Sequence, residues 1–315
     1  MSNMYFLTYE IAGDFLMRNR FYVIGPLLLS LAGAFLFASF PILLQAKEGQ
    51  LSLQWEEAYL QIQHYFSGLS DGSSFRFYTG RTEHSLAEQL GSYWWPSFFY
   101  VSIAALGSLS LGLLLALSLY KYRKVRNTLD MLVIIPDFVI MIMLQLFVVL
   151  FYKSTGILLA RIATFMSDEP AVALPLLSMV LVPTFYVLRN LSVHIDDALT
   201  ADYIRTVKAK GFSRGYILLK HMLPNVIPYL KADLPKFLGI IMSNLFIVEY
   251  FYNVHGITKL MLSSGFERVE VSSGVLSGYQ FPLVLNALLV FMILYGIVLW
   301  MSRLFLYALE KGAKR

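Results

Sequence analysis

Long apolar runs separated by shorter polar segments dominate the chain. Crossing a bilayer core of about 30 Å takes roughly 20 apolar residues in a helix. Six segments approach that length, at residues 21–44, 97–119, 129–151, 171–188, 234–252 and 281–309. A seventh run, 156–166, is too short to span and contains Arg161, so it is interpreted as an interfacial helix. The pattern therefore predicts an all-α integral membrane protein with six transmembrane helices.

Composition strengthens this prediction. Hydrophobic residues make up 57% of the 315 positions and charged residues only 14%, against about 25% in ordinary soluble domains. Mean hydropathy is +0.63. These values argue against a soluble enzyme, a disordered chain and a nucleic-acid-binding module. The absence of cysteine excludes disulfides, thiolate metal sites and cysteine nucleophiles.

The distribution of basic residues predicts the orientation. With the N-terminus inside, eighteen of the 25 Lys and Arg residues fall in inside segments and seven in outside segments, as the positive-inside rule requires. Both termini are then cytoplasmic, and the net charge of +5 reflects topology instead of a nucleic-acid partner. The predicted layout has a cytoplasmic amphipathic segment (1–20), a first span (21–44), a long extracellular loop (45–95) and a core (96–315).

Within the extracellular loop, residues 51–66 have the composition of a helix. Residues 68–80 are rich in Gly and Ser and are expected to be irregular. Trp94 and Trp95, just before the second predicted span, resemble an aromatic belt at a membrane interface.

The cytoplasmic loop 190–231 contains a pattern typical of two short helices joined at Gly211. Glycine suits the left-handed residue that ends a helix. Ser213 can cap the second helix, which is expected to stop at Pro224. The candidate N-caps of the first helix are Asp196, Asp197 and Thr200.

The first of these helices is amphipathic. Tyr203, Ile204 and Val207 share one face, and the other face holds Asp202, Arg205 and Lys208. Lys208 and Lys210 lie near its C-terminal end, where the helix dipole favours cations. Amphipathicity alone fits two interpretations: a helix that docks on a partner, or a basic helix that lies on anionic lipid.

The spacing in this loop resembles the EAA loop of bacterial ATP-binding-cassette (ABC) importer permeases. Residues 205–207 occupy the triad, Gly211 the glycine, and Leu223-Pro224 the final pair. The segment DYIRTVKAKGFS (202–213) is similar to the variant in the peptide/nickel permease family. Residues 135–138 (IPDF) and 247–249 (IVE), followed by Gly256, resemble further motifs of that family, so the likeness covers about residues 96–310.

This resemblance implies a type I ABC importer permease-like fold and a subunit that forms half of a path for dipeptides, oligopeptides or a related small solute. It implies a second permease subunit (hetero- or homodimer), two cytoplasmic ATPases and an external substrate-binding protein. ATP and magnesium would be bound by the ATPases, since this chain has no G-x-x-x-x-G-K-[ST] motif, no cofactor and no catalytic group of its own. The residues expected to form the ATPase-coupling helix and its flanks are Tyr203, Ile204, Arg205, Val207, Lys208, Lys210, Gly211, Leu223 and Pro224.

Two acids are candidates for the pathway or its gate. Asp137 lies about eight residues into the third predicted span, and a carboxylate there either faces a cavity or is paired within the structure. Glu249, near the outer end of the fifth span, either gates the path or holds the following loop by hydrogen bonds. The five scattered histidines predict no metal site.

Two other classes of function stay open from the sequence: a secondary transporter or channel, and a membrane scaffold or sensor that keeps the permease fold without transport.

Overall fold

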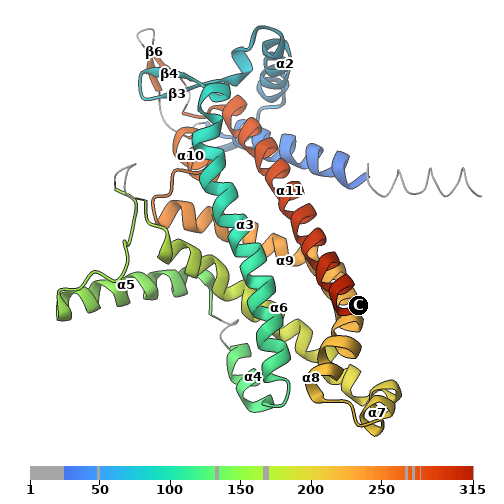
Figure 1. Ribbon diagram of the computed structural model, residues 1–315. Helices are drawn as coiled ribbons and strands as arrows, with labels where there is room; N and C mark the ends of the chain where they lie inside the picture. Colours follow the sequence, from blue (N-terminus) through green and yellow to red (C-terminus); the bar gives the residue numbers. More distant parts are fainter. Residues whose placement is uncertain are drawn as a thin grey trace, which may run out of the picture. The chain divides into compact units, whose positions relative to one another are not determined.

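The computed structural model describes residues 25–47, 50–131, 135–165, 170–266, 269–271, 274–276 and 278–314. Among these residues, six helices are long and apolar enough to cross a membrane, which confirms the predicted all-α architecture (Figure 1). They are Gly25–Leu43, α3 (Leu86–Leu119), α5 (Asp137–Thr155), α6 (Ala173–Thr200), α9 (Leu223–Phe251) and α11 (Phe281–Lys314). The predicted amphipathic segment 1–20 lies outside the described residues.

The third spanning helix begins later than the sequence predicts. It starts at Asp137 instead of residue 129. Pro136 precedes it with φ −58° and ψ 139°, and proline disfavours helical geometry at the residue before it. Arg123–Asp130 forms a separate short helix, α4. Asp137 is therefore the first residue of α5, and its expected position eight residues inside a span is wrong.

The predicted interfacial helix at 156–166 is also wrong, because its described residues form no helix. Tertiary hydrogen bonds hold this segment instead. The Gln145 side chain donates to the carbonyl of Ile162 over 3.0 Å, and the N–H of Thr164 donates to the carbonyl of Tyr252 over 2.8 Å. Because these bonds satisfy backbone polar groups, the segment does not need helical pairing.

The described residues form two compact units. Unit one comprises Met1–Glu88 and Ser263–Val290, and unit two comprises Gln89–Leu262 and Phe291–Arg315, each within the described ranges. The long helices α3 and α11 pass from one unit into the other.

Unit one contains most of the predicted loop 45–95, and much of that loop is regular. Its elements in chain order are β1 (Leu44–Lys47), β2 (Gln50–Leu53), α2 (Trp55–Asp71), η1 (Ser73–Phe75), β3 (Arg76–Thr79) and β4 (Thr82–Ser85). The strands pair as antiparallel hairpins, with Leu44 opposite Leu53 and Arg76 opposite Ser85. A third hairpin joins β5 (Val269–Val271) to β6 (Gly274–Leu276).

The helix expected at 51–66 is present as α2, with shifted bounds. The irregular stretch expected at 68–80 is wrong, since it contains the end of α2, all of η1 and β3. Gly68 belongs to a close turn here: a Cβ at this position would lie 2.5 Å from the hydroxyls of Ser73 and Ser74. Gly68 therefore permits close packing, whereas Gly72 and Gly80 have φ of +80° and +60° and allow the chain to turn.

Buried polar contacts tie the α2 region to the start of α11 within unit one. The Tyr65 hydroxyl donates to Oδ1 of Asn286 over 2.7 Å, and Nδ2 of Asn286 donates to the carbonyl of Ser74 over 2.7 Å. The Tyr65 ring meets that of Phe281 edge-on, with centroids 6.1 Å apart. These partners are more than 200 residues apart in the chain.

The core of unit two is built on α3, α6 and α9, with α6 packed along α9. Small residues of α3 allow close approach to α6. A Cβ on Gly112 would lie 2.6 Å from Val187, and the Ser108 hydroxyl donates to the carbonyl of Val180 over 3.1 Å. This core fixes the ends of α6 and α9, between which the predicted coupling loop lies.

Candidate functional site

The connection between α6 and α9 is shorter than the predicted loop of residues 190–231. Its elements are α7 (Asp202–Ala209), α8 (Arg214–Tyr216) and η3 (Ile217–Met222), a π-helical stretch that runs directly into α9. Residues 190–200 and 223–231 of the predicted loop therefore belong to the two long helices, and α7, α8 and η3 lie between them.

Pro224 does not end the second helix, contrary to the prediction. It lies in the first turn of α9, which continues to Phe251. A proline in a helix lacks the N–H donor and crowds the carbonyl four residues before it. That carbonyl, of Lys220, lies within η3, where the wider π-helical turn uses i→i+5 bonds. The irregular turn accommodates the proline, so the helix continues.

The N-terminal boundary of α7 also differs from the prediction. Its N-cap is Ala201, which is in an extended conformation and has no polar side chain. Asp196 instead pairs with Arg126 of α4, with nitrogen–oxygen distances of 3.1 and 2.7 Å. All three predicted caps lie within α6: Asp196, Asp197 and Thr200.

The turn after α7 has the predicted geometry. Gly211 has φ +82°, a left-handed conformation that other residues rarely adopt, and open space surrounds its Cα. The hydroxyl of Ser213 accepts a 3.4 Å hydrogen bond from the N–H of Tyr216 and caps the next helix. A glycine reversal followed by a capped helix start therefore fixes the direction in which α7 projects.

The residues predicted to couple to an ATPase differ in exposure. Ile204 is fully buried, at 0% exposure, so it anchors α7 and cannot form part of an exposed apolar face with Tyr203. Leu223 is also buried. Val207 and Pro224 are half-buried. The exposed members of the set are Tyr203, Arg205, Lys208, Lys210 and Gly211.

An aromatic cluster next to this turn was missed by the sequence analysis. The rings of Phe212 and Tyr216 stack with centroids 4.8 Å apart, and the ring centroid of His221 lies 5.6 Å from that of Tyr216. Phe212 and Tyr216 are exposed. The i, i+4 spacing of these two residues was the available signal.

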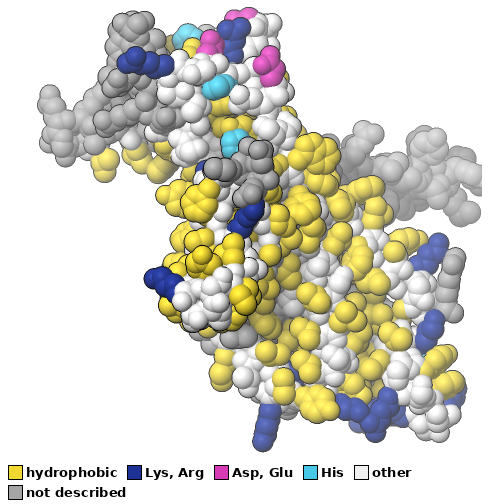
Figure 2. All heavy atoms as spheres, turned by 60° about the vertical axis from the view of Figure 1, so that its left-hand side comes forward, with side chains coloured by type: hydrophobic (Ala, Val, Ile, Leu, Met, Phe, Trp, Pro, Cys, Tyr) yellow, Lys and Arg dark blue, Asp and Glu magenta, His cyan; other side chains and the backbone are white. Residues whose placement is uncertain are grey.

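Basic side chains gather around the same turn. Figure 2 shows Lys and Arg at the end of unit two that carries α4, α7 and α8, next to a broad apolar surface. The exposed basic residues of this region include Lys121, Lys124, Lys208, Lys210 and Arg214. This arrangement fits a contact with acidic groups.

Glu249 of α9 lies at the centre of a buried hydrogen-bond cluster. Its carboxylate accepts bonds from the Ser97 hydroxyl (2.5 Å), from the N–H and hydroxyl of Thr258 (2.8 and 2.5 Å) and from the N–H of Lys259 (3.1 Å). Thr258 and Lys259 belong to α10 (Ile257–Ser264), so the carboxylate satisfies free N–H groups in its first turn. This geometry favours the structural alternative for Glu249 over a gate.

Asp137 is half-buried at the N-terminal end of α5. A carboxylate there interacts favourably with the helix dipole. Within the described residues, no hydrogen bond joins Asp137 to Glu249, so the two acids do not form one site. Among the described residues, no group of three or more acidic or histidine side chains could hold a metal ion.

A polar cluster on two spanning helices was missed by the sequence analysis. Asp233 of α9 accepts hydrogen bonds of 2.6 Å from the Tyr186 hydroxyl and from Nδ2 of Asn190, both on α6. The Lys236 ammonium lies 5.4 Å from the centroid of the Tyr186 ring. With Arg189 these residues line a cavity of about 340 Å³. No local pattern in the sequence indicates this cluster, because the partners are more than 40 residues apart.

Comparison with known proteins identifies a family that this chain matches. Residues 108–311 match the family described as "binding-protein-dependent transport system inner membrane component", which is well over half of the chain. The matched range includes α5, α6, α7 and α9, and therefore the turn at Gly211 and the acid Glu249.

Individual relatives match shorter segments. The chain is 37% identical over 106 residues to the oligopeptide transport system permease protein AppB of Bacillus subtilis (strain 168), covering 32% of each chain. It is 30% identical over 118 residues to the dipeptide transport system permease protein DppB of the same organism (37% of this chain, 38% of the relative). For the oligopeptide transport system permease protein OppB of Escherichia coli (strain K12), identity is 34% over 73 residues (23% and 24%). The matches thus span between 24% and 38% of the length of these relatives.

Proposed function

Because the chain belongs to the family of binding-protein-dependent transport system inner membrane components, we propose that it is the transmembrane permease subunit of an ABC importer. The single observation that carries this proposal is the family match over residues 108–311, which contains α7 and its glycine turn. The six candidate spans make the chain a multi-pass membrane protein.

We propose that α7 and the turn at Gly211 receive motion from a cytoplasmic ATPase. The support is geometric: α7 is anchored on one side by buried Ile204 and exposes Tyr203 and Arg205. Exposed Lys210 and the stacked Phe212 and Tyr216 extend this surface beyond the helix. A short anchored helix transmits a displacement as a rigid body, which a flexible loop would not do. ATP and magnesium belong to the partner subunits in this proposal.

The proposed substrate is a peptide, because the relatives are named for oligopeptide and dipeptide transport. Polar groups on spanning helices usually face a bundle interior or a water-filled cavity. The cluster of Tyr186, Asn190, Asp233 and Lys236 on α6 and α9 is therefore the proposed lining of this chain's half of the path. A second permease, identical or different, would supply the other half.

The proposed location is the bacterial cytoplasmic membrane, with both termini and α7 on the cytoplasmic side. The support is the excess of basic residues in those segments. In this orientation α2 and the hairpins of β1–β4 lie outside, where an external substrate-binding protein would deliver the peptide.

The test is to purify the native complex from membranes in mild detergent and to identify its subunits and bound ligand by mass spectrometry. The expected composition is this chain, one further permease and two ATPase subunits. A monodisperse chain that carries no ATPase, from membranes in which uptake is active, would overturn the proposal.

A further inference from the structure

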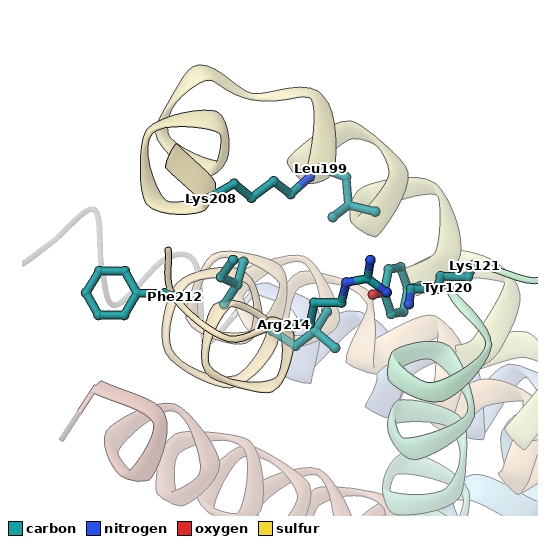
Figure 3. A pocket seen from close by; sticks show the side chains of 8 residues that line it. Tyr120, Lys121, Leu199, Lys208, Phe212 and Arg214 are labelled. Atoms are coloured by element: carbon teal, nitrogen blue, oxygen red, sulfur yellow. The ribbon is translucent and has the colours of Figure 1, made fainter. Parts of the chain in front are cut away.

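A second cavity lies behind α7, where the ends of α3 and α6 meet the start of α8. Its volume is about 480 Å³ (Figure 3). Its basic lining residues are Lys121, Lys208 and Arg214, and its apolar ones include Leu199, Ile217 and Leu218. Figure 3 shows Lys208 extending toward Leu199 of α6 and Arg214 reaching toward Tyr120, while Phe212 points away.

The charge of this cavity is unbalanced. The eight residues that line it include three basic and no acidic side chains. Two other cations of unit two meet carboxylates: Arg126 pairs with Asp196, and Lys231 with Glu310. Like charges that line one cavity repel one another, and an anion between them reduces that cost. The arrangement therefore points to a negatively charged ligand.

The apolar part of the cavity indicates which anion. Ile217 is buried, Leu199 and Leu218 are half-buried, and Tyr120 stands at the end of the spanning helix α3. Tyrosine is enriched where a membrane meets water. A free phosphate would use only the cations, whereas a phospholipid places its phosphate on the cations and its glycerol and upper acyl carbons against the apolar wall.

We propose that this pocket binds the head group of an anionic phospholipid of the cytoplasmic leaflet. The proposal rests on the orientation proposed above and does not depend on the identity of the ATPase or of the transported solute. Basic pockets between spanning helices on the cytoplasmic side bind lipid head groups in other proteins. Such a lipid would bridge α3, α6, α7 and η3.

The test uses the full chain, delipidated in detergent, and measures lipid binding by native mass spectrometry. Dioleoyl phosphatidylglycerol, dioleoyl phosphatidylcholine and glycerol 3-phosphate are titrated separately. Phosphatidylglycerol is expected to bind tighter than phosphatidylcholine. Each of Lys121→Gln, Lys208→Gln and Arg214→Gln should weaken its binding ~5-fold, as expected for one cation near a membrane surface.

Three controls separate binding in the pocket from general charge effects and from loss of folding. Lys210→Gln removes the same charge two residues from Lys208 but does not line the pocket, so it should bind as the wild type does. Arg214→Lys keeps the charge and should also bind normally. Size-exclusion chromatography and thermal unfolding identify any variant that fails to fold. If Arg214→Gln does not fold, Arg214→Lys still tests the site, because it keeps a long aliphatic side chain and the positive charge.

Several outcomes would overturn the proposal. Equal binding of the two lipids would show that the pocket does not select an anion. Glycerol 3-phosphate binding as tight as phosphatidylglycerol would make the ligand a free phosphate compound. An equal loss in Lys210→Gln would indicate general surface attraction. Pocket variants that bind lipid normally but no longer co-purify with ATPase subunits would make the cavity a protein-docking site.

Discussion

At the scale of single residues, the position of the Glu249 side chain depends on the glycine at position 256. The carboxylate of Glu249 is fully buried and accepts four hydrogen bonds. It can occupy that place only because Gly256 has no side chain: a Cβ there would lie 2.1 Å from the carboxyl carbon of Glu249. The sequence identified both residues through their motif. Their contact could not be predicted, because it depends on how the chain reverses after α9.

Replacing Gly256 with alanine is therefore expected to displace the Glu249 carboxylate and to lower the thermal unfolding temperature in detergent. Overpacking at such a site costs about 1–3 kcal/mol. Gly239→Ala is the matched control, since Gly239 lies within α9 with nothing near its Cα, and that variant should unfold at or above the wild-type temperature. Equal unfolding temperatures for the two variants would contradict this account of the cluster.

At the scale of elements, the connection from α6 to α9 shows what local sequence predicts and what it does not. Gly211 and Ser213 predicted the turn and the cap because both act within a few residues of themselves. The lengths of α6 and α9 were underestimated, because polar residues beyond the membrane core continue both helices. Pro224 was interpreted as a stop because the π-helical turn before it leaves no pattern in the sequence.

The left-handed turn at Gly211 gives a prediction for transport. Gly211→Ala introduces a strain of about 1–2 kcal/mol at φ +82°, and Gly211→Val should introduce more. Both are expected to lower peptide uptake by membrane vesicles, valine more than alanine, while the protein level in the membrane stays unchanged. The measurement is uptake of a labelled peptide, normalised to the amount of permease.

Gly215→Ala is the control for this series. Open space also surrounds Gly215, but it lies in α8 and has an ordinary backbone conformation. Its uptake should equal that of the wild type. Normal uptake by Gly211→Val would remove α7 from the coupling path, and a loss in Gly215→Ala equal to that in Gly211→Ala would show that the turn geometry is not the cause.

At the scale of the whole molecule, the six spans were predictable because each is a long apolar run whose length the bilayer sets. The internal order of residues 45–95 was not predictable. Tyr65 and Asn286 are 221 positions apart, and their hydrogen bond forms only when the start of α11 lies beside α2. The polar cluster around Asp233 has the same origin, since its partners come from two helices.

The proposed orientation can be tested directly, because the chain contains no cysteine and gives no labelling background. Ser70→Cys in α2 is expected to react with a membrane-impermeant maleimide in intact cells. Lys124→Cys in α4 should react only after the membrane is opened. Both positions are exposed, so accessibility is set by the side of the membrane. Labelling of Lys124→Cys in intact cells would reverse the orientation.

The unbroken helical run through α8, η3 and α9 has a mechanical consequence. It contains 38 residues, from Arg214 to Phe251, and a straight α-helix of that many residues would be roughly 57 Å long. One end begins at the glycine turn, and near the other end Glu249 is bonded to α10. The run is helical throughout and contains the π-helical stretch η3 and the prolines Pro228 and Pro235. In the proposed coupling, a tilt imposed at the turn would therefore shift α10 as well, because Glu249 bonds the end of the run to α10.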